Sequence, residues 1–204
     1  MLKSGARRNG IMNPIAAQLS LDDIANIAAF FSSRAGAGST TTSDFMPNIA
    51  KTGVAFPRDY KSTFTRYFMQ NMTETKQVRH YYANPVALQA AKSGQPLPDG
   101  SVILTEVYSV KLDRDLDLAK GPDGAWIPNQ LLFYSVMQRG AGWGRDIPEI
   151  LRNGDWNYAA FTPAGQHRPG INHAECLACH KALEKENFAF TMKELAAASR
   201  GRGY

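Results

Sequence analysis

The stretch Ser101-Val-Ile-Leu-Thr-Glu-Val-Tyr-Ser-Val-Lys111 indicates what kind of fold this chain adopts. It is rich in β-branched residues, which pack well on a pleated sheet and are less favoured in helices. Pro96, Pro98 and the pair Asp99-Gly100 form a turn signal immediately before it. We therefore predict a long strand over 101–111, and with it a fold built around a β-sheet.

Similar patterns extend the sheet on both sides of this strand. Segments with strand character cover residues 76–82, 130–138 and 155–162. Between the first of them and residue 101, Asn84 can cap a helix, Pro85 suits its first turn and Gly94 suits its end. This order predicts a short helix over 85–92.

A second helix, of about a dozen residues, is predicted after Pro57. Its apolar face would consist of Tyr60, Phe64, Tyr67 and Phe68, which recur at helical spacing. The chain has no internal repeat and no alternation of strands with helices. We therefore predict an α+β fold, in which a mostly antiparallel sheet is packed with a few helices.

Composition excludes several functional classes. The 204 residues carry a net charge of +5, and 44% of them are hydrophobic, which is typical of a globular protein. No apolar run approaches the ~20 residues that a membrane-spanning helix needs, so no membrane span is expected. The basic residues are densest at the two ends of the chain, at Lys3, Arg7, Arg8, Arg200 and Arg202. We interpret them as frayed tails, so nucleic acid is not an expected partner.

Chemistry enters at Cys176-Leu-Ala-Cys179-His180, a C-x-x-C-H motif. This spacing is the pattern for covalent attachment of a c-type haem. On one helical turn, both thiols and the histidine share a face, so the thiols can add to the vinyl groups of one porphyrin. The imidazole of His180 can then bind the iron. We predict a haem-binding helix here, near the C-terminus.

Two other interpretations of the cysteines are half of a zinc site and a redox dithiol. A zinc site needs more ligands, and the remaining histidines, His80, His167 and His173, form no second motif. We expect His173 to be a surface or helix-start residue rather than a second iron ligand. Five methionines lie among apolar neighbours and are expected in the core: Met46, Met69, Met72, Met137 and Met192.

A haem motif at the C-terminal end is unusual, and the chain resembles the cytochrome P-460 family and its cytochrome c′-beta relatives. The resemblance spans about residues 45–192. It rests on Phe56-Pro-Arg-Asp-Tyr60, Gln77-Val-Arg-His-Tyr-Tyr-Ala-Asn-Pro85, Asp99-Gly-Ser-Val-Ile-Leu-Thr-Glu-Val107, Asp155-Trp-Asn-Tyr158, Cys176 to Lys181 and Phe188-Ala-Phe190. It implies an antiparallel sheet with helices, a homodimer, one haem c bound through His180 and a vacant or loosely held distal face.

The resemblance also marks two residues on the strands. Family members that oxidise hydroxylamine tether a lysine to the porphyrin, and the corresponding position here is Thr105. Threonine has no amine, so a cross-link is not expected and the cytochrome c′-beta branch is favoured. Arg79 matches a family arginine near the haem, where it would contact a distal ligand or a propionate. Alternatively, Arg79 is a surface arginine paired with a carboxylate.

The first 34 residues have a separate resemblance. Asn9-Gly-Ile-Met-Asn-Pro14 and the predicted helix 20–31 resemble the closing segment of a class I cytochrome c, in which Met12 would be an iron ligand. Alternatively, they are a loop and an amphipathic helix. Residues 35–43, of Ala, Gly, Ser and Thr, predict a flexible linker. The expected domains are therefore 1–34, the linker 35–43, and a haem c domain over 44–204.

We expect a c-type haem protein that binds or converts a small nitrogen or oxygen species, such as nitric oxide, hydroxylamine or peroxide. A periplasmic electron-transfer cytochrome is the alternative, and a non-haem metal or redox interaction domain is a third. Haem c is attached outside the bacterial cytoplasm, yet Met1 to Gly10 is no signal peptide. We therefore expect an exported protein, the C-terminal part of a longer dihaem chain, served by a soluble electron-transfer partner. The rival expectation is a shortened protein that begins at Met1.

Overall fold

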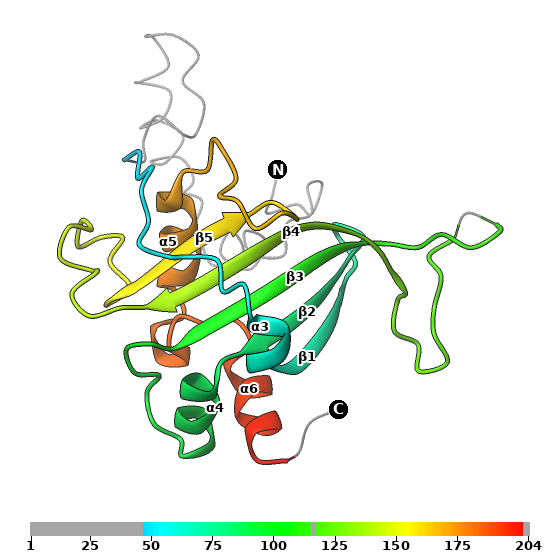
Figure 1. Cartoon of the computed structure of the whole chain (residues 1–204), viewed down its shortest axis with the longest axis horizontal. Helices are drawn as coiled ribbons and strands as arrows, with labels where there is room; N and C mark the ends of the chain where they lie inside the picture. Colours follow the sequence, from blue (N-terminus) through cyan, green and yellow to red (C-terminus); the bar gives the residue numbers. More distant parts are fainter. Residues whose placement is uncertain (1–46, 116, 202–204) are drawn as a thin grey trace, which may run out of the picture. The chain divides into compact units, whose positions relative to one another are not determined.

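A computed structural model describes residues 47–115 and 117–201 of the chain. Its centre is a five-stranded antiparallel sheet in which the strands lie side by side in sequence order (Figure 1). The strands are β1 (Thr65–Met72), β2 (Gln77–Ala83), β3 (Val102–Val110), β4 (Pro128–Arg139) and β5 (Trp156–Phe161). The predicted strands at 76–82, 101–111, 130–138 and 155–162 are confirmed as β2 to β5.

Four α-helices and one 3-10 turn complete the described part of the chain. They are α3 (Tyr60–Thr63), α4 (Pro85–Lys92), α5 (His173–Lys181), η2 (Glu184–Glu186) and α6 (Met192–Ser199). The predicted helix 85–92 is confirmed as α4, in which Asn84 Oδ1 accepts a hydrogen bond from the amide of Ala87 at 3.0 Å. The α+β class and a helix bearing the C-x-x-C-H motif are both confirmed.

The prediction of a long helix after Pro57 is wrong. Only Tyr60–Thr63 is helical, and the chain then enters β1. A register shift in β1 between Arg66 and Phe68 explains the misleading pattern. Because of this bulge, consecutive residues Tyr67 and Phe68 both contact Tyr81, at ring-centroid distances of 6.2 and 5.6 Å. A bulge breaks the two-residue period of a strand, so the aromatics imitate helical spacing.

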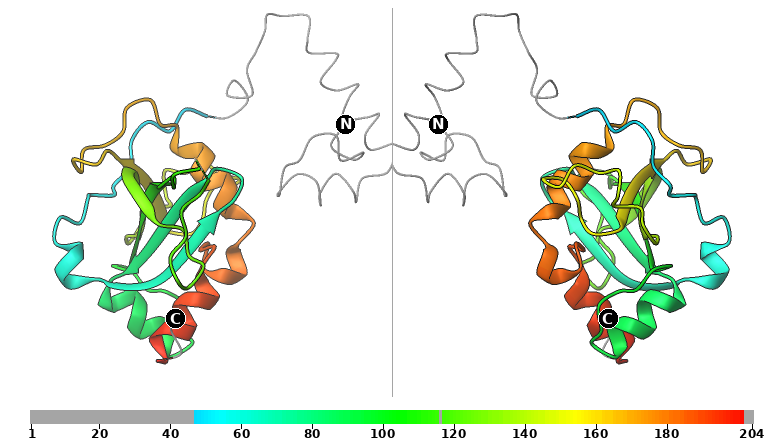
Figure 2. Two further views of the ribbon diagram at one scale, coloured as in Figure 1. Left: turned by 90° about the vertical axis from the view of Figure 1, so that its right-hand side faces the viewer. Right: turned by 90° about the vertical axis from the view of Figure 1, so that its left-hand side faces the viewer.

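The two faces of the sheet are covered differently. Figure 2 shows α3 and the chain before it on one side, and α5 and α6 on the other. The α3 side is packed by an apolar cluster of Val54, Tyr60, Tyr82, Val102, Leu104, Tyr134, Val136, Ala159 and Phe161. The opposite side, which we call the α5 face, carries the C-x-x-C-H helix. It is on this face that the candidate site lies.

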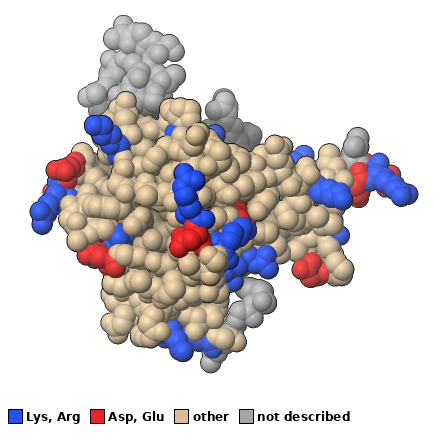
Figure 3. All heavy atoms as spheres, in the orientation of Figure 1, with Lys and Arg blue, Asp and Glu red and all other residues tan. Residues whose placement is uncertain are grey.

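Charged side chains are scattered over the face seen in Figure 3, with uncharged surface between them. Charges of both signs gather at the far end of the connection between β3 and β4, which includes Asp113, Arg114, Asp115 and Lys120. In the described residues no helix is long and apolar enough to cross a membrane. The predicted helix 20–31, the linker 35–43 and Met12 lie outside the described residues.

Candidate functional site

Hydrogen bonds hold helix α5 at its N-terminus and in its second turn. Asn172 caps it by accepting from the amide of Ala174 at 3.1 Å, and it also accepts from the amide of Ile49 at 3.0 Å. The carbonyl of Leu177, in the second turn, accepts from Asn153 Nδ2 at 2.9 Å. Both Asn153 and Leu177 are fully buried. The helix is thus fixed against the rest of the fold, and so are the side chains that it carries.

His173 is the first residue of α5, as expected, but it is buried rather than on the surface. Its Nδ1 lies 2.8 Å from the carbonyl of Ile49, whose oxygen also accepts from the His173 amide at 3.0 Å. The ring therefore ties the incoming chain to the start of α5. The hydrogen bond to Ile49 indicates a structural role for His173.

Cys176 and Cys179 lie one turn apart on α5, and both are free thiols. Cys176 is half-buried and Cys179 is exposed. Burial raises the pKa of both, and for Cys176 the nearby Cys179 and Glu175 raise it further. A redox-active C-x-x-C motif needs a thiol whose pKa is lowered. The raised values therefore count against the redox dithiol interpretation.

His180 follows directly, and its ring orientation is fixed. Its Nδ1 lies 2.6 Å from the carbonyl oxygen of Phe188, and a carbonyl can only accept, so Nδ1 carries the proton. The ring packs on Tyr158 and Phe190, at centroid distances of 4.4 and 4.9 Å. Burial lowers the pKa of His180, although the bond to Phe188 opposes this. A neutral imidazole in this tautomer presents Nε2 as its electron-pair donor.

The strand residues singled out by sequence lie on the same face as this helix. In an antiparallel sheet, directly opposed residues share a face. Thr105 opposes Tyr81 on one side and Ser135 on the other. Arg79 is two residues from Tyr81, so by the alternation of a strand it lies on that face too.

The same register connects Thr105 to His180. Ser135 is two residues from Met137, which opposes Tyr158 on β5. Tyr158 therefore lies on the α5 face, and the ring of His180 packs against it. Arg79, Thr105 and the C-x-x-C-H helix are thus on one side of the sheet.

Arg79 has an unsatisfied donor. Its Nε is buried and has no hydrogen-bond partner among the described residues. The ion pairs of the described residues involve Lys61, His80 and Arg139, so the alternative of a carboxylate partner for Arg79 finds no support there. A guanidinium whose Nε is buried without a partner among the described residues is suited to a further polar or anionic acceptor.

The sequence model of the Cytochrome P460 family matches residues 57–191, which is more than half of the 204 residues. The chain belongs to the cytochrome P460 family. This confirms the resemblance seen in the sequence, while the class I cytochrome c resemblance of residues 1–34 stays a prediction. No curated protein matches the chain.

Membership in the cytochrome P460 family implies a haem cofactor. The residues of this chain fit such a group: two free thiols and one imidazole on α5, and a buried, unpartnered Arg79 Nε on the same side of the sheet. The other histidines that the structure describes, His80, His167 and His173, contact residues other than the two cysteines, so the zinc interpretation gains no further ligand from them. His80 faces Glu106, and His167 packs against Phe161 with ring centroids 4.5 Å apart, both on the α3 side.

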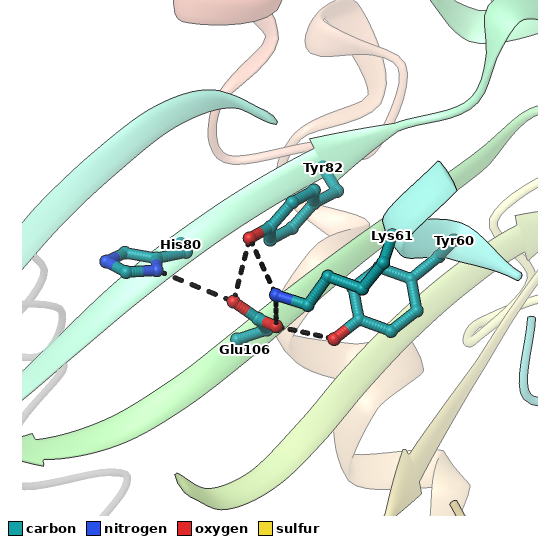
Figure 4. A network of polar contacts seen from close by, with 5 residues as sticks. All are labelled: Tyr60, Lys61, His80, Tyr82 and Glu106. Atoms are coloured by element: carbon teal, nitrogen blue, oxygen red, sulfur yellow. Dashed lines mark hydrogen bonds and ion pairs between the residues drawn. The ribbon is translucent and has the colours of Figure 1, made fainter. Parts of the chain in front are cut away.

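Sequence reasoning missed a polar cluster on the α3 side, centred on the buried carboxylate of Glu106 (Figure 4). Oxygen Oε1 accepts from Tyr60 at 2.5 Å and pairs with Lys61 at 2.5 Å. Oxygen Oε2 accepts from Tyr82 at 2.9 Å and lies 3.5 Å from His80 Nδ1. Burial alone would raise the pKa of Glu106, but these four partners lower it to about 2. A lone acidic residue within an apolar strand was the signal.

The methionines that the structure describes behave as expected for packing residues where contacts are known. Met69 packs against a small cluster of Val78, Val110 and Trp126, and Met137 is 7% exposed. Met46 and Met12 lie outside the described residues.

Proposed function

We propose that this protein is a c-type haem protein that binds or converts a small nitrogen or oxygen species at an open distal site, with His180 as the proximal ligand. One observation carries the proposal. In a member of the cytochrome P460 family, His180 is held by the Phe188 carbonyl with Nε2 left as its donor, beside two free thiols on the same helix.

Attachment is proposed through Cys176 and Cys179. Their spacing on α5 matches thioether bonding to one porphyrin edge, and both are free cysteines. A single haem c in residues 44–204 follows from the single motif there. When bound, the haem supplies an iron centre that can change valence and coordinate a small ligand.

Arg79 is proposed to serve the distal side or a propionate. A guanidinium is positively charged, and the Nε of Arg79 is buried without a hydrogen-bond partner among the described residues, which supports contact with a polar or anionic group. Thr105, on the same face, has no amine and so cannot form the family's lysine tether. We therefore place this chain nearer to the ligand-binding members than to the hydroxylamine oxidisers.

The subunit number and the cellular location of the protein stay predictions from the sequence. We propose an exported, periplasmic homodimer that exchanges electrons with a soluble partner. Both rest on the family resemblance and on where haem c is attached. A cross-linking or light-scattering measurement of the haem-loaded protein gives the subunit number directly.

The electron paramagnetic resonance spectrum of the ferric protein tests the proposal. Iron bound by one histidine and no strong distal ligand is expected to be high-spin. An electron carrier, which has two strong axial ligands, is expected to be low-spin. A wholly low-spin spectrum would overturn the open distal site, and an unaltered spectrum in His180→Ala would overturn the proximal assignment.

A further inference from the structure

The turn between η2 and α6 has an unusual backbone. Asn187 and Phe188 are consecutive and both have left-handed dihedrals, with φ of 53° and 57°. Asparagine enters this region readily, whereas a bulky residue such as phenylalanine rarely does. A conformation of this kind persists only where its surroundings hold it, and such positions cluster at functional sites.

Two backbone bonds close the turn locally. The amide of Asn187 donates to the carbonyl of Glu184 at 3.2 Å, and the amide of Phe188 donates to the carbonyl of Leu183 at 2.7 Å. These bonds resemble those that end a helix on left-handed residues. They fix the turn to η2, which follows α5, but do not fix it to the rest of the fold.

The third bond comes from a distant segment. Oδ1 of Asn187 accepts from the amide of Leu97 at 3.0 Å, across 90 positions of sequence. Leu97 stands between Pro96 and Pro98, neither of which has an amide proton, so its N–H is the single donor of this tripeptide. Leu97 is fully buried, and its carbonyl accepts from Arg139 Nη1 at 2.7 Å.

This arrangement ends at the candidate site. With Asn187 and Phe188 held in the left-handed region, the Phe188 carbonyl points at His180 Nδ1, 2.6 Å away. We propose that Asn187 is a positioning residue for the imidazole of His180: its backbone and its contact with Leu97 hold the Phe188 carbonyl where it fixes Nδ1 and leaves Nε2 as the atom that would bind a haem iron. The proposal rests on the proposed assignment of His180 as proximal ligand.

The expected chemical effect has a definite sign. A carbonyl that accepts a hydrogen bond from Nδ1–H increases the electron density at Nε2 and would so strengthen its bond to iron. A stronger donor stabilises ferric iron more than ferrous iron, which lowers the reduction potential. Loss of the Phe188 contact should therefore weaken the iron–histidine bond and raise the potential.

Asn187→Ala is the main test, because alanine lacks the amide oxygen and disfavours a positive φ. In the haem-loaded protein we expect the ferrous iron–histidine stretching band in resonance Raman to move to lower frequency, and the reduction potential to rise. Asn187→Gly permits the backbone conformation but removes the Leu97 contact, so a smaller shift in the same direction is expected. It also serves if the alanine variant does not fold.

Asn84→Ala is the matched control. It removes an asparagine that caps α4, bonds the amides of Ala87 and Val102, and lies outside the turn that contacts His180. It should lower stability without moving the band. A wild-type band and potential in both Asn187 variants would overturn the proposal.

The potential is measurable whether or not the distal position is filled, so this test does not depend on ligand binding. If His180→Ala keeps the native spectrum, the proposed ligand assignment fails. If His180→Ala loses it while the Asn187 variants stay unchanged, the positioning role alone fails.

Discussion

The hydroxyl of Tyr60 lies 2.5 Å from the carboxylate of Glu106, a residue that is 1% exposed. Lys61 and Tyr82 complete the shell around the carboxylate, and His80 approaches its second oxygen. A buried charge is tolerated when partners of this kind replace its water. Glu106 is next to Thr105 on β3 but points to the other side of the sheet. This cluster therefore stabilises the strand that carries Thr105.

Glu106→Gln should destabilise the fold in a pH-dependent manner. The pKa of Glu106 is lowered from 4.5 to about 2 in the folded protein, so its stabilisation is complete above about pH 4.5 and is lost as the pH falls toward 2. At neutral pH the variant should lose about 3 kcal/mol of unfolding free energy. Urea unfolding at several pH values measures the difference.

Glu74→Gln is the control, since Glu74 is exposed in the turn between β1 and β2. It should change the unfolding free energy by less than about 0.5 kcal/mol. The difference in unfolding free energy between wild type and Glu106→Gln should become smaller below about pH 4.5. A difference in unfolding free energy that stays constant down to pH 2 would contradict the claim that Glu106 is ionised in the folded protein.

Much of the sheet could be predicted because its inner strands are rich in β-branched and aromatic residues. Strand β1 could not, because its bulge places Tyr67 and Phe68 against the same partner. Helix α6, which begins at Met192, was also missed, although Thr191 and Glu194 have the spacing of a capping box; in the structure Thr191 makes no capping bond. A strand interrupted by a bulge loses the alternation by which a strand is recognised in a sequence.

The candidate site was predictable to a similar extent. The C-x-x-C-H spacing alone points to Cys176, Cys179 and His180, because residues three and four positions apart on a helix share a face. The partner of His180 could not be predicted, since it is the backbone oxygen of Phe188 in a left-handed conformation. The direction of a backbone carbonyl depends on the backbone dihedrals, and residue type alone does not predict it.

The cysteines should hold the haem covalently. Haem-dependent peroxidase staining should survive denaturing electrophoresis, and the double variant Cys176→Ala, Cys179→Ala should lose it. Glu175→Gln, on an exposed position of the same helix, should keep the stain. Extraction of the colour from the native protein by acid acetone would contradict covalent attachment.

No second protein link to the porphyrin is expected, because Thr105 lacks an amine. The intact mass should equal the polypeptide plus one haem. After trypsin digestion, the haem peptide should contain only the segment around Cys176 to His180. A second attached peptide, for instance one carrying Lys92 or Lys111, would show that the assignment of Thr105 is wrong, and would favour hydroxylamine oxidation.

Arg79→Leu should weaken the binding of an anionic ligand. The variant loses a charged donor whose hydrogen bond is worth about 1.5 kcal/mol or more, so the azide affinity of the ferric protein should fall by about tenfold. Arg145→Leu, in an exposed loop, should leave the azide affinity unchanged. Equal azide affinities in wild type and Arg79→Leu would exclude a distal role for Arg79.

The most direct test of the central claim is the absorption spectrum of the ferrous protein before and after carbon monoxide is added, repeated with nitric oxide. With His180 proximal and the distal face open, we predict a five-coordinate spectrum that each gas converts to a new ligand-bound form. A low-spin, six-coordinate spectrum that neither gas alters would contradict this account and support an electron carrier.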